Sequence, residues 1–184
     1  MADRNNSSNF SRECIETALF MIMKSKPYDE ITITDIAEKA GVSRMAYYRN
    51  YKDKEDILFR FLEKSIMQKI DECRSEDGRI SFRKIIHATA EFFSGNASVM
   101  AGILGSNIMG TLMTKVEDEI VNYFPHILDN PSDTYMAVFY SGAIVSVFRA
   151  WFESGMKESV DEITNLICGI IGNDVMNLFE ERMN

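Results

Sequence analysis

Side chains that can bind anions gather in one short stretch near the N-terminus of the chain. Residues 39–54 contain five basic residues and one acidic residue, which leaves a local charge of +4. The basic residues are Lys39, Arg44, Arg49, Lys52 and Lys54. Arginine pairs with guanine edges, and a hydroxyl, tyrosine or lysine at a helix end suits phosphate oxygens. This stretch therefore has the composition of a surface that holds nucleic acid.

The net charge of the chain is negative, but this does not exclude such a surface. The 184 residues carry 20 basic and 28 acidic side chains, a formal charge of −8. Residues 1–60 hold 10 of each sign, so the whole excess lies in residues 61–184, with 10 basic and 18 acidic side chains. A local basic patch can hold DNA phosphates while the rest of a protein is acidic.

Residues that would support catalysis or a metal site are scattered. His87 and His126 are the only histidines, and we find no metal-ligand spacing around them. The sequence has no glycine-rich phosphate loop and no nucleophile elbow. Cys14, Cys73 and Cys168 are odd in number and far apart, which suits reduced packing thiols. We predict no enzymatic activity, no cofactor and no metal. A helical enzyme or binding module is the alternative.

Helical periodicity places the basic stretch on short helices. Apolar residues at helical spacing predict a first helix over residues 11–24. Thr32 and Asp35 then form a capping box at the start of a short second helix. Gly41 ends that helix, because glycine adopts the left-handed conformation that a sharp turn needs.

A third short helix follows directly after Gly41 and completes a pair of short helices joined by a turn. Ser43 offers an N-cap before a helix over residues 44–50, on which Tyr47 is expected to be buried. Two short helices joined by a glycine turn form a helix-turn-helix, here at about residues 31–50. Ile36, Ala40, Val42 and Tyr47 would form its small shared core.

The rest of the chain also has the pattern of helices. We expect a long helix at about 54–74 and then helices at about 80–94, 97–110, 110–124, 133–155 and 160–182. No useful length alternates with the period of a strand. The fold class is therefore all-α, with an N-terminal three-helix domain over residues 8–66 and a larger helical-bundle domain over residues 67–184.

The sequence predicts neither a secretory signal nor a membrane-spanning segment. Residues 1–9 are polar and lack the apolar stretch of a secretory signal. The longest nearly apolar run, Met136 to Phe148, is shorter than the ~20 residues that span a bilayer, and Arg149 follows it. We expect a cytoplasmic protein without membrane contact.

The stretch from Thr32 to Ile57 resembles the signature of the TetR family of transcriptional regulators. That signature runs Thr-x-x-x-Ile-Ala-x-x-Ala-Gly-Val-Ser-x-x-x-x-Tyr-x-x-Phe-x-x-Lys-x-x-Leu. The matching residues are Thr32, Ile36, Ala37, Ala40, Gly41, Val42, Ser43, Tyr48, Lys54 and Ile57. Tyr51 stands where the family usually has Phe. The resemblance covers about residues 10–65.

The resemblance implies a three-helix DNA-binding domain and a larger helical domain that dimerises and usually binds a small effector. By position, one group of residues would approach base edges: Thr34, Arg44, Met45 and Ala46. A second group would hold phosphates: Thr32, Ser43, Tyr48, Asn50 and Lys54. The expected partner is a double-stranded operator with an inverted repeat.

The segment 139–156 more weakly resembles a TetR subgroup that includes regulators of dihydroxyacetone kinase operons. The similarity rests on the spacing of Gly142, Trp151 and Gly155. An activator of that kind can work with a partner protein in place of a free ligand. We therefore expect a dimeric repressor that an effector releases, with an effector-independent or partner-controlled regulator, such as an activator, as the alternative.

Small residues in the C-terminal part suggest where two helices approach closely. Gly142, Ser146 and Ala150 recur every four residues, and Gly169 and Gly172 lie on the expected last helix. These positions fit a homodimer built as a two-fold bundle of four helices, while close packing within one subunit is the alternative.

Methionine and aromatic residues in the middle helices suggest an effector pocket, because methionine adapts to varied apolar guests. The candidates are Phe92, Met100, Met109, Met113, Tyr123 and Tyr135. A plain apolar core explains any single one of them equally well.

Overall fold

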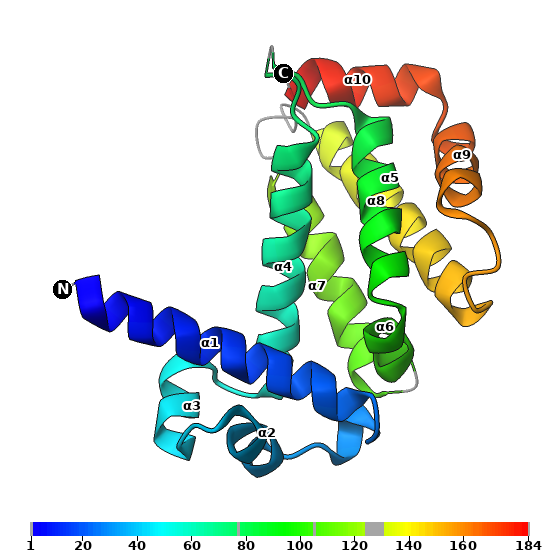
Figure 1. The fold of residues 1–184 in the computed structure, drawn as a ribbon. Helices are drawn as coiled ribbons and strands as arrows, with labels where there is room; N and C mark the ends of the chain where they lie inside the picture. The colour runs from blue at the N-terminus through cyan, green and yellow to red at the C-terminus, as the bar shows by residue number, and fades with distance from the viewer. Residues whose placement is uncertain (1, 77, 105, 124–130, 184) are drawn as a thin grey trace. The chain divides into compact units, whose positions relative to one another are not determined.

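The computed structural model describes residues 2–76, 78–104, 106–123 and 131–183, and this part of the chain is almost entirely helical (Figure 1). The α-helices are α1 (Ala2–Met23), α2 (Ile33–Ala40), α3 (Arg44–Asn50), α4 (Lys54–Glu72), α5 (Phe82–Gly95), α6 (Ala97–Leu104), α7 (Ile108–Tyr123), α8 (Pro131–Glu153), α9 (Val160–Ile171) and α10 (Asn173–Met183). A 3-10 helix, η1 (Tyr28–Glu30), joins α1 to α2. The only strand-like feature of the described residues is a bridge between Arg74 and Ile80. The all-α prediction is confirmed.

The chain divides into two compact units. The N-terminal unit contains the residues up to Leu62 together with residues 98–109, and the C-terminal unit contains residues 63–97 and 110–184. The first unit thus ends close to the predicted boundary at residue 66. The N-terminal unit also contains most of α6 and the start of α7, which the sequence predicts to lie in the C-terminal domain over residues 67–184.

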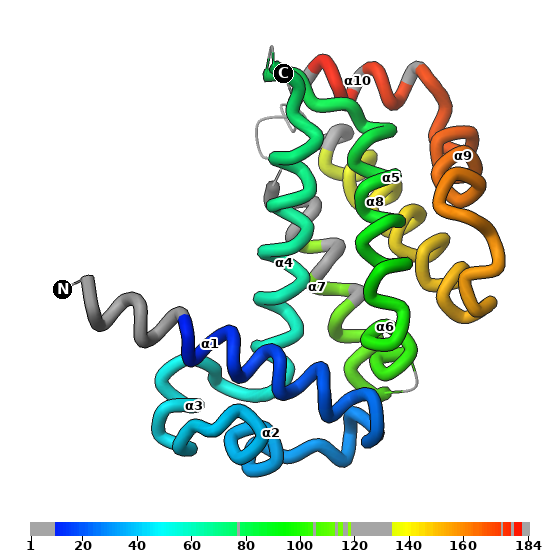
Figure 2. Tube along the Cα trace, in the orientation of Figure 1, coloured from blue at the N-terminus to red at the C-terminus, as the bar shows by residue number. Residues whose placement is uncertain are grey.

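In the N-terminal unit, α1 packs against both α2 and α3 (Figures 1 and 2). Ile15 and Leu19, four residues apart on α1, are fully buried, as are Ile36 of α2 and Tyr47 of α3. The predicted burial of Ile36 and Tyr47 is therefore confirmed. Ala40 and Val42, predicted for the same core, are half-buried at its edge.

The ends of α2 and α3 follow their local sequence. The Thr32 side chain accepts from the backbone N–H of Asp35, whose carboxylate accepts from the N–H of Thr32 in return. Gly41 has a φ of 67°, so the left-handed turn after α2 is confirmed. Ser43 accepts from the N–H of Ala46 at 3.1 Å and caps α3 as predicted.

In the C-terminal unit, α5 packs against α9, and α8 and α10 also contact α9. Aromatic side chains fill part of this core: the ring of Phe93 on α5 lies 5.3 Å from Phe148 and 4.9 Å from Phe152, both on α8. The indole N–H of Trp151 donates to the carbonyl of Glu158 at 3.0 Å. This contact fixes the connection from α8 to α9.

Two predicted helices are broken in the structure. The single last helix expected over 160–182 is wrong, because Gly172 has a φ of 79° and separates α9 from α10. A positive φ is incompatible with a continuing α-helix. The helix expected over 97–110 ends at Leu104. The Pro125 end of the expected Pro125/Pro131 loop lies outside the described residues, and Pro131 begins α8.

One stretch of the described residues, Thr134–Glu153 on α8, is long and apolar enough to cross a membrane. Length and composition alone are weak support for a membrane span, because the core helix of a water-soluble protein passes the same test. One third of the stretch is buried in this structure.

Candidate nucleic-acid interface

The α3 helix has one buried side and one exposed side. Tyr47 is fully buried, whereas its neighbour Tyr48 is 49% exposed and Met45 is 74% exposed. Arg44, the first residue of α3, and Thr34 on α2 are exposed as well. An arginine, a methionine and a tyrosine therefore project from one short helix that cannot be stable alone. The sequence predicts this exposed side of α3 to be the surface that approaches base edges.

The two N-caps near this surface are hydroxyl side chains. The hydroxyl oxygens of Thr32 and Ser43 accept backbone N–H groups, and both residues are exposed. A hydroxyl that accepts one hydrogen bond retains a proton to donate. Thr32 and Ser43 can therefore cap their helices and donate to a phosphate oxygen at the same time, as the sequence predicts.

Asn50 lies inside the unit instead of on its surface. It is 7% exposed, and its side-chain amide donates to the carbonyl of Ala46 at 2.7 Å. Its side-chain oxygen accepts from Arg12 Nε on α1 at 3.3 Å. These contacts do not bear on the phosphate contact predicted for Asn50. They show that Asn50 holds the last turn of α3 against α1.

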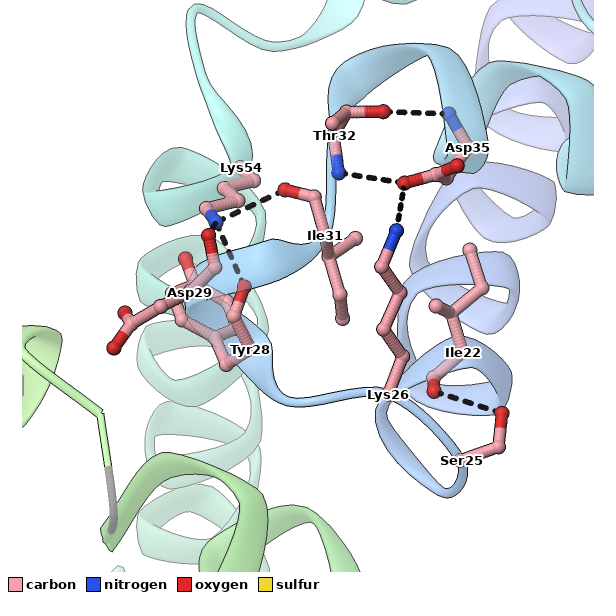
Figure 3. Close-up of polar contacts among 9 residues, drawn as sticks. All are labelled: Ile22, Ser25, Lys26, Tyr28, Asp29, Ile31, Thr32, Asp35 and Lys54. Carbon is pink, nitrogen blue, oxygen red and sulfur yellow. Dashed lines mark hydrogen bonds and ion pairs between the residues drawn. The ribbon is translucent and has the colours of Figure 1, made fainter.

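Lys54 is also directed into the unit (Figure 3). Its ammonium donates to three backbone carbonyls in and beside η1, and the same nitrogen lies 4.4 Å from the centre of the Tyr28 ring. Of the five basic residues in the stretch 39–54, Lys54 is half-buried. The other four are exposed: Lys39, Arg44, Arg49 and Lys52. The exposed cations lie along α2, α3 and the loop that follows.

Tyr51, the departure from the family signature, uses its additional hydroxyl. The side chain is 2% exposed, and its hydroxyl donates to Glu16 Oε1 of α1 at 2.6 Å. Burial, and after it the hydrogen bond to Glu16, raises the pKa of Tyr51. The Arg60 guanidinium lies 5.5 Å from the Tyr51 ring. No function was predicted for Tyr51 from the sequence. The signal that could have indicated one is Glu16, a residue of α1 that can accept a hydrogen bond from the additional hydroxyl.

An ion pair supports the start of α2. Lys26 Nζ lies 2.7 Å from the carboxylate of Asp35, which also accepts from the N–H of Thr32 at 2.8 Å. The hydrogen bond from Lys26 is the main reason that the pKa of Asp35 falls to about 2. Asp35 thus remains ionised over the physiological range, which suits a carboxylate at a helix N-terminus.

The predicted effector-pocket residues are divided between the two units. Met100 is buried and Met109 half-buried in the N-terminal unit, while Phe92 is half-buried in the C-terminal unit. Tyr135 is 76% exposed. The side chains of Met113 and Tyr123 lie outside the described residues. A different feature, an open groove of about 790 Å³ in the C-terminal unit, is lined mainly by polar side chains such as Ser75, Lys84 and Glu180.

The predicted dimer residues lie largely at the surface of the single chain. Ser146, Ala150 and Gly169 are exposed, and Gly142 and Gly172 are half-buried. Large apolar side chains on the same two helices are also exposed. They are Tyr135 at 76%, Val138 at 53% and Phe139 at 68% on α8, with Leu166 at 51% and Ile170 at 62% on α9.

His87 has acidic neighbours that the sequence did not suggest. Its Nε2 lies 3.2 Å from Asp161, and its Nδ1 lies 3.6 Å from Glu91. Across the part of the chain that the structure describes, no group of three His, Cys, Asp or Glu side chains is placed to hold a metal ion. His126 lies outside that part.

Two protein families match the chain. Residues 80–173, about half of the chain, match the family described as "Transcriptional regulator C-terminal region". Residues 16–61, which include α2, α3 and the turn between them, match "Bacterial regulatory proteins, tetR family". The first match lies within residues 67–184 and the second within residues 8–66.

Among curated proteins, the chain is similar to nucleoid occlusion factors named SlmA. It is 26% identical over 110 residues to SlmA of Marinobacter nauticus, covering 57% of this chain and 56% of that protein. It is 29% identical over 104 residues to SlmA of Alteromonas mediterranea, covering 54% and 53%. The chain therefore spans about half the length of the curated relatives that it matches.

Solved structures of similar fold extend over nearly the whole chain. A TetR transcriptional regulator from Streptococcus agalactiae covers 94% of this chain and 99% of its own, with a TM-score of 0.65 and 16% identity. The dihydroxyacetone kinase operon activator DhaS covers 93% and 96%, with a TM-score of 0.58 and 15% identity. At these identities the similarity shows the fold alone.

Proposed function

This chain belongs to the TetR family of bacterial transcriptional regulators, and from that premise we propose that it binds an inverted-repeat operator as a homodimer and that a small effector releases it. Regulators of this family are non-enzymatic DNA-binding proteins, which agrees with the prediction from the sequence. The observation that carries the proposal is the exposed side of α3. Arg44, Met45 and Tyr48 are exposed there, and Tyr47 on the opposite side of the helix is fully buried.

The proposed contacts divide into reading and holding. Arg44 and Met45 stand at the start of α3, the end of a recognition helix that enters the major groove. Thr32, Ser43 and Tyr48 present hydroxyl groups that suit phosphate oxygens. Thr34 and Ala46 complete the group proposed to approach base edges.

The DNA-binding proposal is tested by selection of duplexes from a randomised pool with the full-length chain. We expect enrichment of an inverted repeat, because a two-fold dimer presents two α3 helices to two half-sites. The most enriched sequence is referred to below as the selected duplex. Enrichment of a single half-site, or no enrichment at all, would contradict the proposal.

The dimer proposal is supported by the exposed apolar faces of α8 and α9. Tyr135, Val138 and Phe139 lie three and four residues apart and so share one side of α8, and Leu166 and Ile170 share one side of α9. A Cβ at Gly169 would meet nothing within 4 Å among the residues that the structure describes. Packing within one subunit therefore gives no reason for a glycine there, whereas the close approach of a second copy does.

Light scattering on the purified chain tests the dimer. We expect a dimer at micromolar concentration, and Ser146→Arg should give monomers that bind the selected duplex poorly. Ser94→Arg, at an exposed position on α5, is the matched control and should stay dimeric. A monomeric wild type would overturn the proposal, and binding of the wild type to lipid vesicles would instead assign the apolar stretch of α8 to a membrane.

Control by an effector is supported by the position of residues 98–109. This segment lies within the region that matches the C-terminal family, yet it is part of the N-terminal unit. The backbone N–H and the side-chain amide of Asn107 each donate to the Asp29 carboxylate at 3.3 Å. Gly102 of α6 lies against Met23 of α1, where a Cβ would meet Met23 Cε at 3.1 Å. A ligand that displaces residues 98–109 would therefore disturb these contacts and so affect the position of the DNA-binding helices.

The coupling requires that a ligand favour one of two states, since equal affinity for both shifts nothing. Thermal-shift screening of small apolar compounds should find stabilising ligands, and the best should weaken binding to the selected duplex. Asn107→Ala should leave ligand binding intact and reduce its effect on DNA affinity, whereas Thr114→Ala on α7 should not. Ligands that stabilise the protein without changing DNA affinity would argue for the alternative, a regulator controlled by a partner protein. DhaS, similar in fold, is named as an activator, so the sign of control is tested by transcription from a promoter carrying the selected duplex.

A further inference from the structure

The start of α2 is held by a short path of polar contacts that begins at Lys54 (Figure 3). The Lys54 ammonium donates to three backbone carbonyls: Tyr28 at 2.7 Å, Ile31 at 3.0 Å and Asp29 at 3.3 Å. An ammonium group has three N–H donors, so these three acceptors match its full capacity. The 3-10 helix η1 thus ends in a cap supplied by the first residue of α4.

The peptide group between Ile31 and Thr32 is fixed at both of its polar atoms. Its oxygen accepts from Lys54 at 3.0 Å, and its N–H donates to Asp35 at 2.8 Å. The same Asp35 oxygen accepts from Lys26 at 2.7 Å. This peptide immediately precedes α2, so its orientation sets the direction in which α2 begins.

The surroundings of Lys54 oppose a second task for its ammonium. The side chain is half-buried, and its nitrogen lies 4.4 Å from the centre of the ring of Tyr28, which is itself 2% exposed. A cation held by carbonyl dipoles and an aromatic face gains from both. A phosphate oxygen could bind this ammonium only by replacing one of the carbonyls.

We propose that Lys54 is a positioning residue, which sets the orientation of α2 through the Ile31–Thr32 peptide, and that its ammonium remains on the three carbonyls when the protein binds DNA. This inference rests on the proposed DNA-binding function and changes the phosphate-holding role expected for Lys54. Thr32 and Thr34 are the groups that it places. Because Lys54 begins α4, a shift of α4 along its axis acts directly on the same peptide.

The first experiment compares Lys54→Met with Lys52→Met in the full-length chain. Lys52 is exposed two residues earlier and has the same charge, so it serves as the matched control. A phosphate contact, when removed, lowers the slope of log affinity against log salt by about 0.9 for each contact. We expect Lys54→Met to weaken binding to the selected duplex by about tenfold or more, as for loss of a hydrogen bond to a charged group, with the salt slope unchanged. A slope that falls by about 0.9 for each Lys54 removed would overturn the proposal, as would unchanged affinity.

Amide hydrogen exchange of the free protein separates positioning from general destabilisation. In Lys54→Met we expect faster exchange at the amides of Thr32 and Asp35, with exchange in α9 unchanged. Lys52→Met should alter neither segment. This measurement needs no DNA, so it tests the link from Lys54 to α2 even if the wild type selects no duplex and the proposed function fails.

The wild type provides a test that does not depend on a variant folding. In a sample with 15N-labelled lysine, the Nζ signal of Lys54 should be visible in the free protein, because hydrogen-bonded ammonium protons exchange slowly, and should keep its position when the selected duplex is added. A scalar coupling between this nitrogen and a DNA phosphorus would show that the ammonium moves to a phosphate and would overturn the proposal.

Discussion

The two units expose their proposed functional surfaces in opposite ways. In the N-terminal unit, several polar groups around α2 and α3 have partners within the chain: the Lys54 ammonium donates to backbone carbonyls, and the Ser43 hydroxyl accepts from the N–H of Ala46. In the C-terminal unit, the exposed sides of α8 and α9 carry large apolar residues, such as Phe139 and Ile170. The first surface is organised before its ligand arrives, whereas the second exposes area that burial would stabilise. The proposed DNA-reading surface thus differs from the proposed dimer surface in its order within the single chain, and the proposed dimer surface differs in its exposed apolar area.

The largest expected effect contrasts a buried and an exposed aromatic residue of α8. Phe148 is 4% exposed, so Phe148→Ala should lower the free energy of unfolding by about 3–5 kcal/mol through the cavity it leaves. Phe139 is 68% exposed, and Phe139→Ala should instead weaken association between subunits. Urea unfolding at several protein concentrations separates the two effects. An equal loss for both variants, independent of concentration, would remove the distinction between core and interface on this helix.

The next effect separates base reading from charge within α3. Arg44→Ala should reduce binding to the selected duplex by about 1–3 kcal/mol and affect an unrelated duplex much less. Arg49, exposed in the last turn of the same helix, is the matched control, and Arg49→Ala should weaken both duplexes alike. Binding titrations with both duplexes provide the comparison. If Arg44→Ala weakens both equally, its proposed reading role must be withdrawn.

A smaller effect compares two serine caps, one in each unit. Ser43 accepts from Ala46 N–H at 3.1 Å, and Ser159 accepts from Glu162 N–H at 3.3 Å at the start of α9. Each Ser→Ala change should lower the free energy of unfolding by about 1 kcal/mol. Only Ser43→Ala should also weaken binding to the selected duplex, because only that cap fixes a helix that we propose contacts DNA. If Ser159→Ala remains fully folded and still loses DNA affinity, the cap of α9 affects DNA binding by the N-terminal helices.

The features predicted from the sequence are those that depend on residues a few positions apart. The capping box of Thr32 and Asp35, the left-handed Gly41 and the burial of Tyr47 all follow from local spacing, and all are present. The family signature extends this success, since it fixes the register of the whole helix-turn-helix.

The features that the sequence did not predict depend on contacts between distant positions. Lys54 meets its carbonyls 23 to 26 residues earlier, and Asn50 meets Arg12 at a separation of 38. The inclusion of residues 98–109 in the N-terminal unit is a tertiary property of the same kind. No local periodicity encodes such partners, so the phosphate contact predicted for Lys54 rested on its position in the family signature and on its charge, and not on its surroundings in the fold.

The smallest expected effect compares the two capping-box carboxylates, Asp35 of α2 and Glu162 of α9. Both have a lowered pKa, Asp35 chiefly through the hydrogen bond from Lys26 and Glu162 chiefly through the backbone N–H of Ser159. The pKa of Asp35 falls from 3.8 to about 2 on folding. A carboxylate whose pKa is depressed by folding stabilises the protein above its unfolded pKa, and this stabilisation is lost as the pH falls through the folded pKa.

Unfolding by urea should therefore show a loss of stability in the wild type between about pH 4 and pH 2, and Asp35→Asn should lose less over that window because it has no proton to take up. Added salt should shrink the difference for Asp35, whose ion pair with Lys26 is partly exposed, more than for Glu162→Gln, whose partners are the backbone and hydroxyl of Ser159. If Asp35→Asn follows the wild type throughout the window, the Lys26 contact does not form in solution. The start of α2 would then be held by the cap and by Lys54 alone, and the organised surface of the N-terminal unit would depend on fewer contacts than the structure shows.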